Sequence, residues 1–177
     1  KAVLSTMASL DKRAKNVQVG MVVTDKYTGG IAAMVGDKQP SYEGFNRAVE
    51  IRRPIGSLIK PFVYASALRQ ADRFTLATPV EDKPITLKNE QGKTWSPKNV
   101  DKKFSGQVPL LNAFKDSMNV PTVNVGLAVG VEKVAATLKK SGWEDDISPY
   151  PSMLLGAVNG SPLMVAQVYQ TLADEGR

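Results

Sequence analysis

The stretch Arg52–Leu68, RRPIGSLIKPFVYASAL, places a serine and a lysine three residues apart at the head of an apolar segment. Residues three apart lie on one face of a helix, so Ser57 and Lys60 are predicted to touch. The ring of Pro61 would clash with the Ser57 carbonyl inside a continuing helix, so the helix should begin at or beside Ser57. Unpaired N–H groups at that end favour a developing anion. We therefore predict a helix from Ser57 to Gln70 with a nucleophile and a base as candidates at its start.

Lys60 can act as a base only when it is neutral. A free lysine, with a pKa near 10.4, is neutral in about four molecules in ten thousand at pH 7. The pKa of Lys60 must therefore be lowered by burial or by neighbouring cations. The sequence offers both. Apolar neighbours could bury Lys60, namely Ile55, Leu58, Ile59 and Phe62, and the cations Arg52 and Arg53 lie close in sequence.

The spacing alone does not identify a site. With 12 serines and 16 lysines in 177 residues, about one Ser-x-x-Lys match is expected by chance. Ser9 and Lys12 also match, inside an amphipathic helix predicted for residues 1–15. Nothing around Ser9 suggests a site. A second feature is needed to favour Ser57.

That second feature is the Ser-x-Asn at Ser117–Asn119, which occurs once in the chain. A helix should end there, because Val120 precedes Pro121 and is biased away from the helical region. Ser117 could relay a proton to a leaving group, and Asn119 could hold Lys60 or a substrate amide. The alternative is that Ser117 and Asn119 only cap helix ends.

Composition narrows the chemistry. The chain has no His and no Cys, which excludes Ser-His-Asp and cysteine catalysis, disulfides, and His/Cys metal sites. We predict neither a cofactor nor a metal. The net charge is +6 with scattered basic residues, and the one tight group, Lys98, Lys102 and Lys103, is expected to be a solvated loop. We therefore predict no nucleic-acid partner, and no apolar run is long enough to span a membrane.

Periodicity predicts two strands and several helices. Residues 17–35 form a hairpin around Gly29 and Gly30, and residues 72–107 should be long and irregular. Helices are predicted over residues 108–118, 120–130, 131–142 and 161–176, the last with Ser161 as N-cap. A two-stranded hairpin is not stable alone. Either helices cover it or further strands lie beyond residue 177.

At these residues the chain resembles the transpeptidase domain of class A penicillin-binding proteins, whose motifs are Ser-x-x-Lys, Ser-x-Asn and Lys-Thr-Gly. Longer blocks resemble the family in order and spacing: GFNRAVEIRRPIGSLIKPFVYASAL, WSPKN, DSMNVPTVNVGLAVG and PSMLLGAVNGSPLMVAQVYQTLADEG. IGSLIKP and WSPKN look most similar to the bifunctional 1B type. The resemblance covers essentially the whole chain.

The resemblance implies an α+β fold of the serine penicillin-recognising (β-lactamase/transpeptidase-like) class. In that fold helices pack on an antiparallel sheet, of which only the N-terminal hairpin is expected here. Residues 1–177 would form the N-terminal and helical part of a single transpeptidase domain. The remaining strands are expected beyond residue 177.

The resemblance also implies roles. Ser57 would be the acylated nucleophile and Lys60 its general base. Ser117 would carry the proton to the leaving group, and Asn119 would orient Lys60 and the substrate amide. Ser57, Ser117 and Asn119 would contact the substrate, a peptidoglycan stem peptide ending in D-Ala-D-Ala. β-Lactams would acylate the same serine.

The implied parent is a membrane-anchored protein on the periplasmic side of the bacterial inner membrane, with a glycosyltransferase domain outside this chain. Cell-wall regulators are further possible partners. The chain departs from the family in one respect, because it has no Lys-[Ser/Thr]-Gly. In the family that motif lines the cleft, and its strand supplies one oxyanion amide. The other would be the N–H of Ser57. The 177 residues alone are therefore expected to react poorly.

Two alternatives remain open at this stage. The chain could be a non-catalytic β-lactam sensor or a scaffold module that keeps the fold. It could also be a serine β-lactamase, although it lacks a Glu-x-x-Asn segment after the Ser-x-Asn. An intact Lys-Thr-Gly in the parent would favour the transpeptidase.

Overall fold

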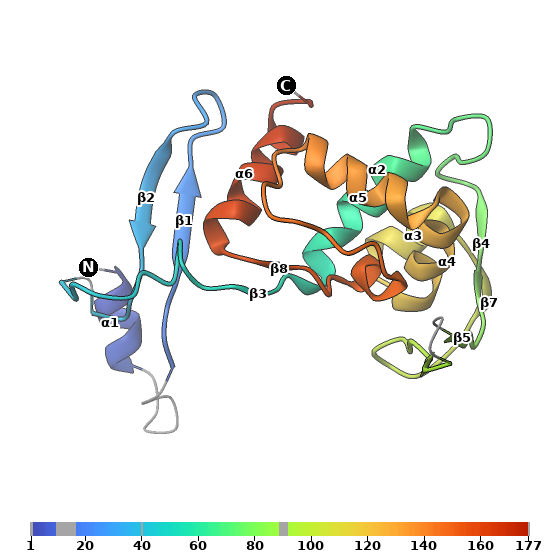
Figure 1. Ribbon diagram of the computed structural model, residues 1–177, viewed down its shortest axis with the longest axis horizontal. Coiled ribbons are helices and arrows are strands. Elements are labelled where there is room, and N and C mark those ends of the chain that lie inside the picture. The colour runs from blue at the N-terminus through green and yellow to red at the C-terminus, as the bar shows by residue number, and fades with distance from the viewer. Residues whose placement is uncertain (1, 10–16, 40, 89–91, 177) are drawn as a thin grey trace. The chain divides into compact units, whose positions relative to one another are not determined.

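The computed structural model describes residues 2–9, 17–39, 41–88 and 92–176 (Figure 1). Helices and small antiparallel sheets together make an α+β fold, which confirms the predicted class. The chain divides into two compact units. Unit 1 comprises Lys1–Pro54, Lys139–Asp145 and Asn159–Arg177, and unit 2 comprises Ile55–Leu138 and Asp146–Val158.

In unit 1 a hairpin packs against the last helix. Strands β1 (Met21–Thr24) and β2 (Ile31–Val35) pair antiparallel, as predicted. Helix α6 (Pro162–Ala173) lies beside β1 (Figure 1), where the Thr24 hydroxyl bonds the Gln170 side chain at 3.2 Å. Ser161 caps α6 by accepting a hydrogen bond from the Met164 N–H, as the sequence predicts.

The remaining elements of unit 1 are short. Helix α1 spans Ala2–Ser9, and strand β3 (Arg53–Pro54) pairs with β8 (Asn159–Gly160). The helix predicted for residues 1–15 is therefore observed in part, and residues 10–16 lie outside the described residues. Lys12 of the second Ser-x-x-Lys is among them.

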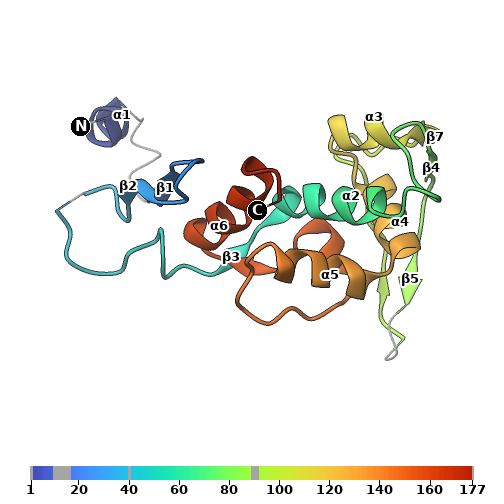
Figure 2. The same cartoon turned by 90° about the horizontal axis from the view of Figure 1, so that it is seen from above.

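Unit 2 is built around two helices that pack together. A 3₁₀ turn, η2 (Gly56–Ile59), runs directly into α2 (Lys60–Leu68), and α4 (Asn119–Val129) packs against α2 (Figure 2). The side chains that fill this interior are apolar and buried: Ile59, Phe62, Val63, Val120 and Val123. Pro61 lies in the first turn of α2, so the predicted helix start is confirmed.

The other elements of unit 2 surround these helices. They are β4 (Pro79–Asp82), β5 (Leu87–Lys88), β6 (Thr94–Trp95), β7 (Gly106–Pro109), α3 (Leu110–Lys115) and the 3₁₀ helix η3 (Pro151–Leu155). Helix α5 (Val131–Lys140) begins in unit 2 and ends in unit 1, before Gly142 at φ +102°. The helices predicted over residues 108–118, 120–130 and 131–142 are thus confirmed, with shorter bounds for α3.

The prediction that residues 72–107 are irregular holds for most of the described residues of this range, but it missed short strands. The range contributes to four strands, of which β4 pairs antiparallel with β7 and β5 with β6. The sheets are therefore not limited to the N-terminal hairpin. In β4 the two buried positions are Val80 and Asp82, so a polar residue takes an inward place and hides the period of two. Strands β5 and β6 have two residues each, too few for any pattern.

Candidate active site

Ser57 lies on an accessible turn that is clamped by backbone bonds. Ile55 N–H bonds the Val158 carbonyl at 3.0 Å, and Gly56 N–H bonds the Gly156 carbonyl at 3.2 Å. The turn's own first bond runs from Leu58 N–H to the Ile55 carbonyl at 3.4 Å, so the N–H of Ser57 precedes the bonded part. Ser57 is exposed. Ser57 is therefore accessible to a ligand.

The clamp depends on two glycines that sequence reasoning did not single out. Gly56 has φ +57° and Gly156 has φ +82°, a region that glycine adopts without steric cost. A Cβ on Gly156 would overlap the Gly56 carbonyl oxygen, so the two backbones meet only because that side chain is missing. The available sequence signal was the position of Gly156 directly after η3, where glycine often ends a helix.

Lys60 lies one turn beyond Ser57, with its ammonium group directed inward. The Lys60 N–H bonds the Ser57 carbonyl, closing the 3₁₀ turn, in which residues three apart eclipse. Only 2 % of Lys60 is exposed. Burial lowers the pKa of Lys60 from 10.5 to about 8. A neutral lysine is thus far more accessible here than in water, as the proposed base requires.

Ser117 and Asn119 lie on the turn between α3 and α4. Ser117 has φ +50°, and Met118 is extended before α4 begins at Asn119. The junction was predicted correctly, but its cause was not. Val120 is helical despite preceding a proline, and the break falls two to three residues earlier.

The structure brings Lys60, Ser117 and Asn119 together across 57 and 59 residues of sequence. Lys60 Nζ donates to the Ser117 carbonyl at 2.5 Å, to Ser117 Oγ at 3.1 Å and to Asn119 Oδ1 at 2.8 Å. Within the described residues, Ser57 Oγ is not a partner of Lys60. The N-cap of α4 is Met118, without a side-chain cap bond, so the Ser117 and Asn119 side chains face Lys60 and do not serve as caps.

A buried tyrosine ties α2 to the same turn. Tyr64 Oη lies 2.9 Å from Thr122 Oγ1, and the Thr122 hydroxyl donates to the Met118 carbonyl at 2.6 Å. The Tyr64 ring packs at 4.8 Å from that of Phe114 on α3. Burial raises the pKa of Tyr64 to about 12, so it stays a neutral donor at physiological pH. Lys60 and Tyr64 are four residues apart, which places both on the α2 face that meets α4.

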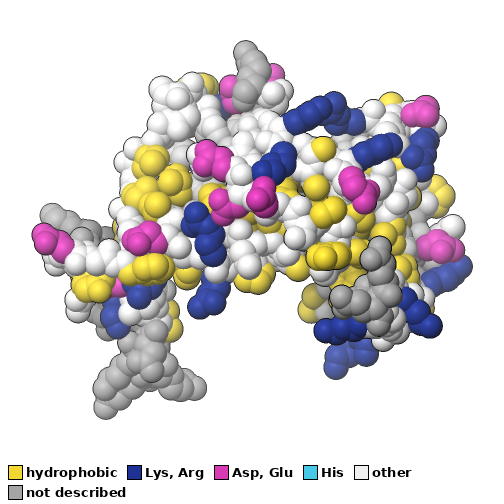
Figure 3. Space-filling model, viewed as in Figure 1, with side chains coloured by type: hydrophobic (Ala, Val, Ile, Leu, Met, Phe, Trp, Pro, Cys, Tyr) yellow, Lys and Arg dark blue, Asp and Glu magenta, His cyan; other side chains and the backbone are white. Residues whose placement is uncertain are grey.

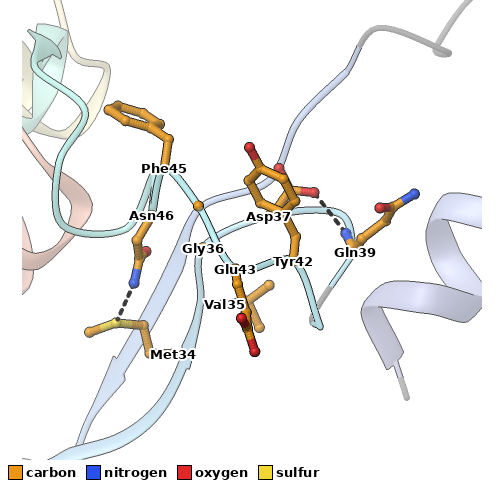
Figure 4. Close-up of a pocket in the computed structure, with 10 residues that line it drawn as sticks. Met34, Val35, Gly36, Asp37, Gln39, Tyr42, Glu43, Phe45 and Asn46 are labelled. Carbon is orange, nitrogen blue, oxygen red and sulfur yellow. Dashed lines mark hydrogen bonds between the residues drawn. The ribbon is translucent and has the colours of Figure 1, made fainter.

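A separate pocket of about 320 Å³ lies in unit 1, between the end of β2 and the loop after it (Figure 4). None of the four predicted site residues lines it. Two acids line it, Asp37 and Glu43. Asp37 is paired with Arg47, and Asn46 donates toward the sulfur of Met34. It holds no serine or lysine, so it does not offer the chemistry described above.

The rest of the described chain offers no competing site. No group of three or more acidic side chains that could hold a metal ion occurs among the described residues. The basic residues Lys98, Lys102 and Lys103 are exposed, and on the face seen in Figure 3 Lys and Arg side chains are interspersed with acidic ones. None of the described helices is long and apolar enough to cross a membrane.

The chain is similar to known proteins over most of its length. Residues 19–177 match the family model of the penicillin binding protein transpeptidase domain. The chain is 48 % identical to penicillin-binding protein 1B of Vibrio cholerae over 164 residues, which are 92 % of this chain and 21 % of that protein. It is 44 % identical to penicillin-binding protein 1B of Escherichia coli over 181 residues, covering 99 % and 21 %.

Solved structures show the same fold. The crystal structure of penicillin-binding protein 1A from Haemophilus influenzae matches with a TM-score of 0.81 and 30 % identity, over 87 % of this chain and 23 % of that one. The PonA1 protein from Mycobacterium tuberculosis in complex with penicillin V matches with a TM-score of 0.75 and 20 % identity, over 97 % and 48 %. The chain spans about a fifth of the length of the curated relatives it matches.

Proposed function

We propose that this chain, which belongs to the penicillin-binding protein transpeptidase family, supplies the nucleophile and the base of a peptidoglycan D,D-transpeptidase. The observation that carries the proposal is the buried Lys60 ammonium, held by Ser117 and Asn119 one turn from the accessible Ser57. A desolvated lysine is the base that a serine nucleophile needs in a chain without histidine.

In the proposed reaction Ser57 Oγ attacks the carbonyl carbon of the bond between two D-Ala residues, and neutral Lys60 takes the hydroxyl proton. The C–N bond then breaks, and the leaving amine receives a proton from Lys60 through the Ser117 hydroxyl. The acyl group remains on Ser57. An amine on a neighbouring stem peptide attacks this ester and loses a proton to Lys60. The C–O bond to Ser57 then breaks, Lys60 returns the proton to Ser57 Oγ, and the new amide is released.

Asn119 would have two functions in this scheme. Its Oδ1 accepts from Lys60, and one Nδ2 hydrogen is donated to the Lys98 carbonyl at 2.9 Å. The second Nδ2 hydrogen is then left for a carbonyl of the substrate. The N–H of Ser57 would supply one of two oxyanion donors, at the start of the helical turn where anions are favoured.

Stem peptides ending in D-Ala-D-Ala are the proposed substrates, and β-lactams the proposed covalent inhibitors at Ser57. We further propose that the protein works on the periplasmic side of the inner membrane, held by an anchor outside this chain. A glycosyltransferase domain and further strands of a single transpeptidase domain would also lie outside it. These proposals rest on the family and on relatives named penicillin-binding protein 1B.

The 177 residues by themselves are proposed to react slowly, because their sequence lacks a Lys-[Ser/Thr]-Gly. Losing a single oxyanion donor typically lowers a rate by about 10²–10³. Stopped-flow acylation of the isolated chain by penicillin should therefore be at least a hundredfold slower than acylation of the protein purified from its native host, called the native protein below. Equal rates would refute the proposed need for that strand.

The deciding experiment labels the native protein with a fluorescent penicillin and compares wild type with Ser57→Ala and Ser9→Ala. We expect the label to disappear only in Ser57→Ala, while thermal unfolding shows that both variants fold. Label that survives in Ser57→Ala would refute the assignment, and label lost only in Ser9→Ala would move it to the other Ser-x-x-Lys. Label without any cross-linking turnover would favour the sensor alternative.

The pH dependence of acylation is a second test. Because Lys60 must be neutral and its pKa is about 8, the acylation rate should rise about tenfold per pH unit below 8 and level off above it. Stopped-flow rates from pH 6 to 10 measure this. A rate independent of pH below 8 would exclude Lys60 as the base.

A further inference from the structure

Asn99, in the WSPKN segment, is buried and uses its whole carboxamide. Only 6 % of it is exposed. Its Oδ1 accepts the backbone N–H groups of Asn119 and Val120, both at 3.1 Å. Its Nδ2 donates to Asp82 Oδ1 at 2.7 Å and to the Lys103 carbonyl at 2.9 Å. One side chain thus joins the start of α4 to strand β4.

Asp82 determines which way the Asn99 carboxamide points. Asp82 is fully buried, and its second oxygen accepts the Ser105 N–H at 2.8 Å. A carboxyl with both oxygens engaged as acceptors requires a donor from Asn99. Nδ2 must therefore face β4, and Oδ1 must face α4. A flipped Asn99 would place oxygen against oxygen and leave two N–H groups of α4 without an acceptor.

The same segment sets the direction of the Asn119 carboxamide. The Lys98 carbonyl accepts from Asn119 Nδ2 at 2.9 Å, which turns Oδ1 toward Lys60 Nζ at 2.8 Å. Residues 98 and 99 therefore hold Asn119 by its side chain and by its backbone N–H. The Lys60 ammonium, which only donates, favours the same orientation, so the two contacts reinforce each other.

The turn that is held in this way is strained. Ser117 adopts φ +50°, a region that costs a non-glycine residue about 1–2 kcal/mol and persists only with support from the surroundings. Both Lys60 contacts of this turn, through Ser117 and through Asn119, depend on that conformation. A relaxed turn would displace the groups that face Lys60.

We infer that Asn99, oriented by the buried Asp82, is a positioning residue for acyl transfer, which fixes the Ser117–Asn119 turn against Lys60. It touches neither the substrate nor Ser57, and acts through Asn119. The inference rests on the proposed function. A wild-type protein that takes no penicillin label would refute the function, whereas the variants below test Asn99 only in a protein that does.

The experiment exchanges the two side chains. Asn99→Asp places two carboxylates at the 2.7 Å contact between positions 82 and 99. Asp82→Asn introduces an NH₂ group where both neighbours donate, so it faces either Asn99 Nδ2 or the Ser105 N–H. The double variant Asp82→Asn/Asn99→Asp removes both conflicts. The new amide at position 82 donates to the new carboxylate at position 99, which still accepts from Asn119 and Val120. At the Lys103 carbonyl the donated bond is lost and two oxygens face each other, so the recovery is expected to be partial.

The readout is acylation of the native protein by fluorescent penicillin, recorded as a rate constant and as a final labelled fraction. A misplaced catalytic group slows the rate constant, since about 1 Å of displacement can cost about a hundredfold. A purely structural role lowers only the fraction of molecules that fold and react. Ser66→Ala is the matched control, because it removes two 2.7 Å bonds of a buried side chain on another face of α2.

We expect each single variant to acylate at least tenfold more slowly than wild type, and the double variant to recover at least tenfold over Asn99→Asp. The control should keep the wild-type rate constant within about twofold. Single variants within threefold of wild type, or a double variant no faster than the slower single one, would overturn the inference. If Asn99→Asp does not fold, Asp82→Asn alone tests the inference. Acylation at least tenfold slower than wild type would support it, and acylation within threefold of wild type would overturn it.

Discussion

The helical core around Lys60 and the β1–β2 hairpin are both rich in apolar residues in sequence but differ in burial. In the core, Ile59 and Phe62 are 0 % and 1 % exposed. In the hairpin, Met21 and Val23 are 47 % and 46 % exposed, although they alternate as a strand should. The difference shows that a periodic pattern predicts an element without predicting what covers it. Of the four candidate site residues, Lys60 is the one buried in this core, and its burial is what lowers its pKa.

The largest effect is expected at the glycine clamp of the core. Gly156→Ala would place a Cβ in overlap with the Gly56 carbonyl oxygen at φ +82°, so the Ser57 turn must move. We expect a loss of at least about 4 kcal/mol in the free energy of unfolding, measured by urea denaturation. Gly106→Ala is the control, with φ +79° and open space, and should cost about 1–2 kcal/mol. Equal losses in the free energy of unfolding for the two variants would show that backbone strain, and not the clash, accounts for the effect of Gly156→Ala.

The next effect tests the comparison directly. Phe62→Ala removes a fully buried ring and should cost about 3–5 kcal/mol. Val23→Ala, in the hairpin, removes a half-exposed side chain and should cost less than about 1 kcal/mol. Urea denaturation of both variants measures the difference. Similar losses would mean that the hairpin is covered in solution, contrary to its exposure here.

The sequence was sufficient where one residue type has a strong local effect. Pro61 placed the start of α2, Ser161 capped α6, and the alternation of residues 17–35 predicted the hairpin. It was also sufficient to nominate Ser57, Lys60, Ser117 and Asn119, whose roles remain predictions. The structure adds that three of them meet at Lys60 Nζ.

The remainder depended on pairings between distant residues that no local pattern reveals. The sequence pattern did not predict strand β4, because the polar residue Asp82 takes an inward, buried position. The side chain that bonds Asp82 there, Asn99, lies 17 residues away. The approach of Gly156 to Gly56 joins backbones 100 residues apart. Spacing could not separate Ser57 from Ser9 either. The burial of Lys60 supports Ser57, and it is a property of the folded chain; Lys12, the partner of Ser9, lies outside the described residues.

The burial of Lys60 has a measurable cost that depends on pH. The pKa of Lys60 is about 8 in the folded protein, against 10.5 for an exposed lysine, so between these pH values the unfolded chain binds more protons. The free energy of unfolding should therefore rise with pH across this window, by up to about 1.4 kcal/mol per unit and about 3 kcal/mol in total. Subtracting the curve of Lys60→Met isolates this contribution. If the wild-type and Lys60→Met curves of unfolding free energy against pH run parallel, Lys60 is solvated in the folded protein.

The smallest effect is expected for a single hydrogen bond in the same core. Tyr64→Phe keeps the ring against Phe114 but removes the hydroxyl that lies 2.9 Å from Thr122 Oγ1. Thr122 already donates to the Met118 carbonyl, so the Tyr64 hydroxyl is the donor of the lost bond. Thr122 Oγ1 keeps its own donation and loses only an incoming one. We therefore expect a loss of about 1–2 kcal/mol, measured by urea denaturation.

Tyr150→Phe is the matched control for this variant, because Tyr150 is exposed and its change should alter stability by less than about 0.5 kcal/mol. The Tyr64 bond also supports the turn that carries Ser117 and Asn119, so Tyr64→Phe should slow penicillin acylation by about two- to fivefold, well below the effect of Asp82→Asn. A Tyr64→Phe protein as stable as Tyr150→Phe would show that water replaces the hydroxyl. Tyr64 would then be less well shielded from water than Lys60. The difference in burial between core and hairpin would apply only to the residues nearest Lys60.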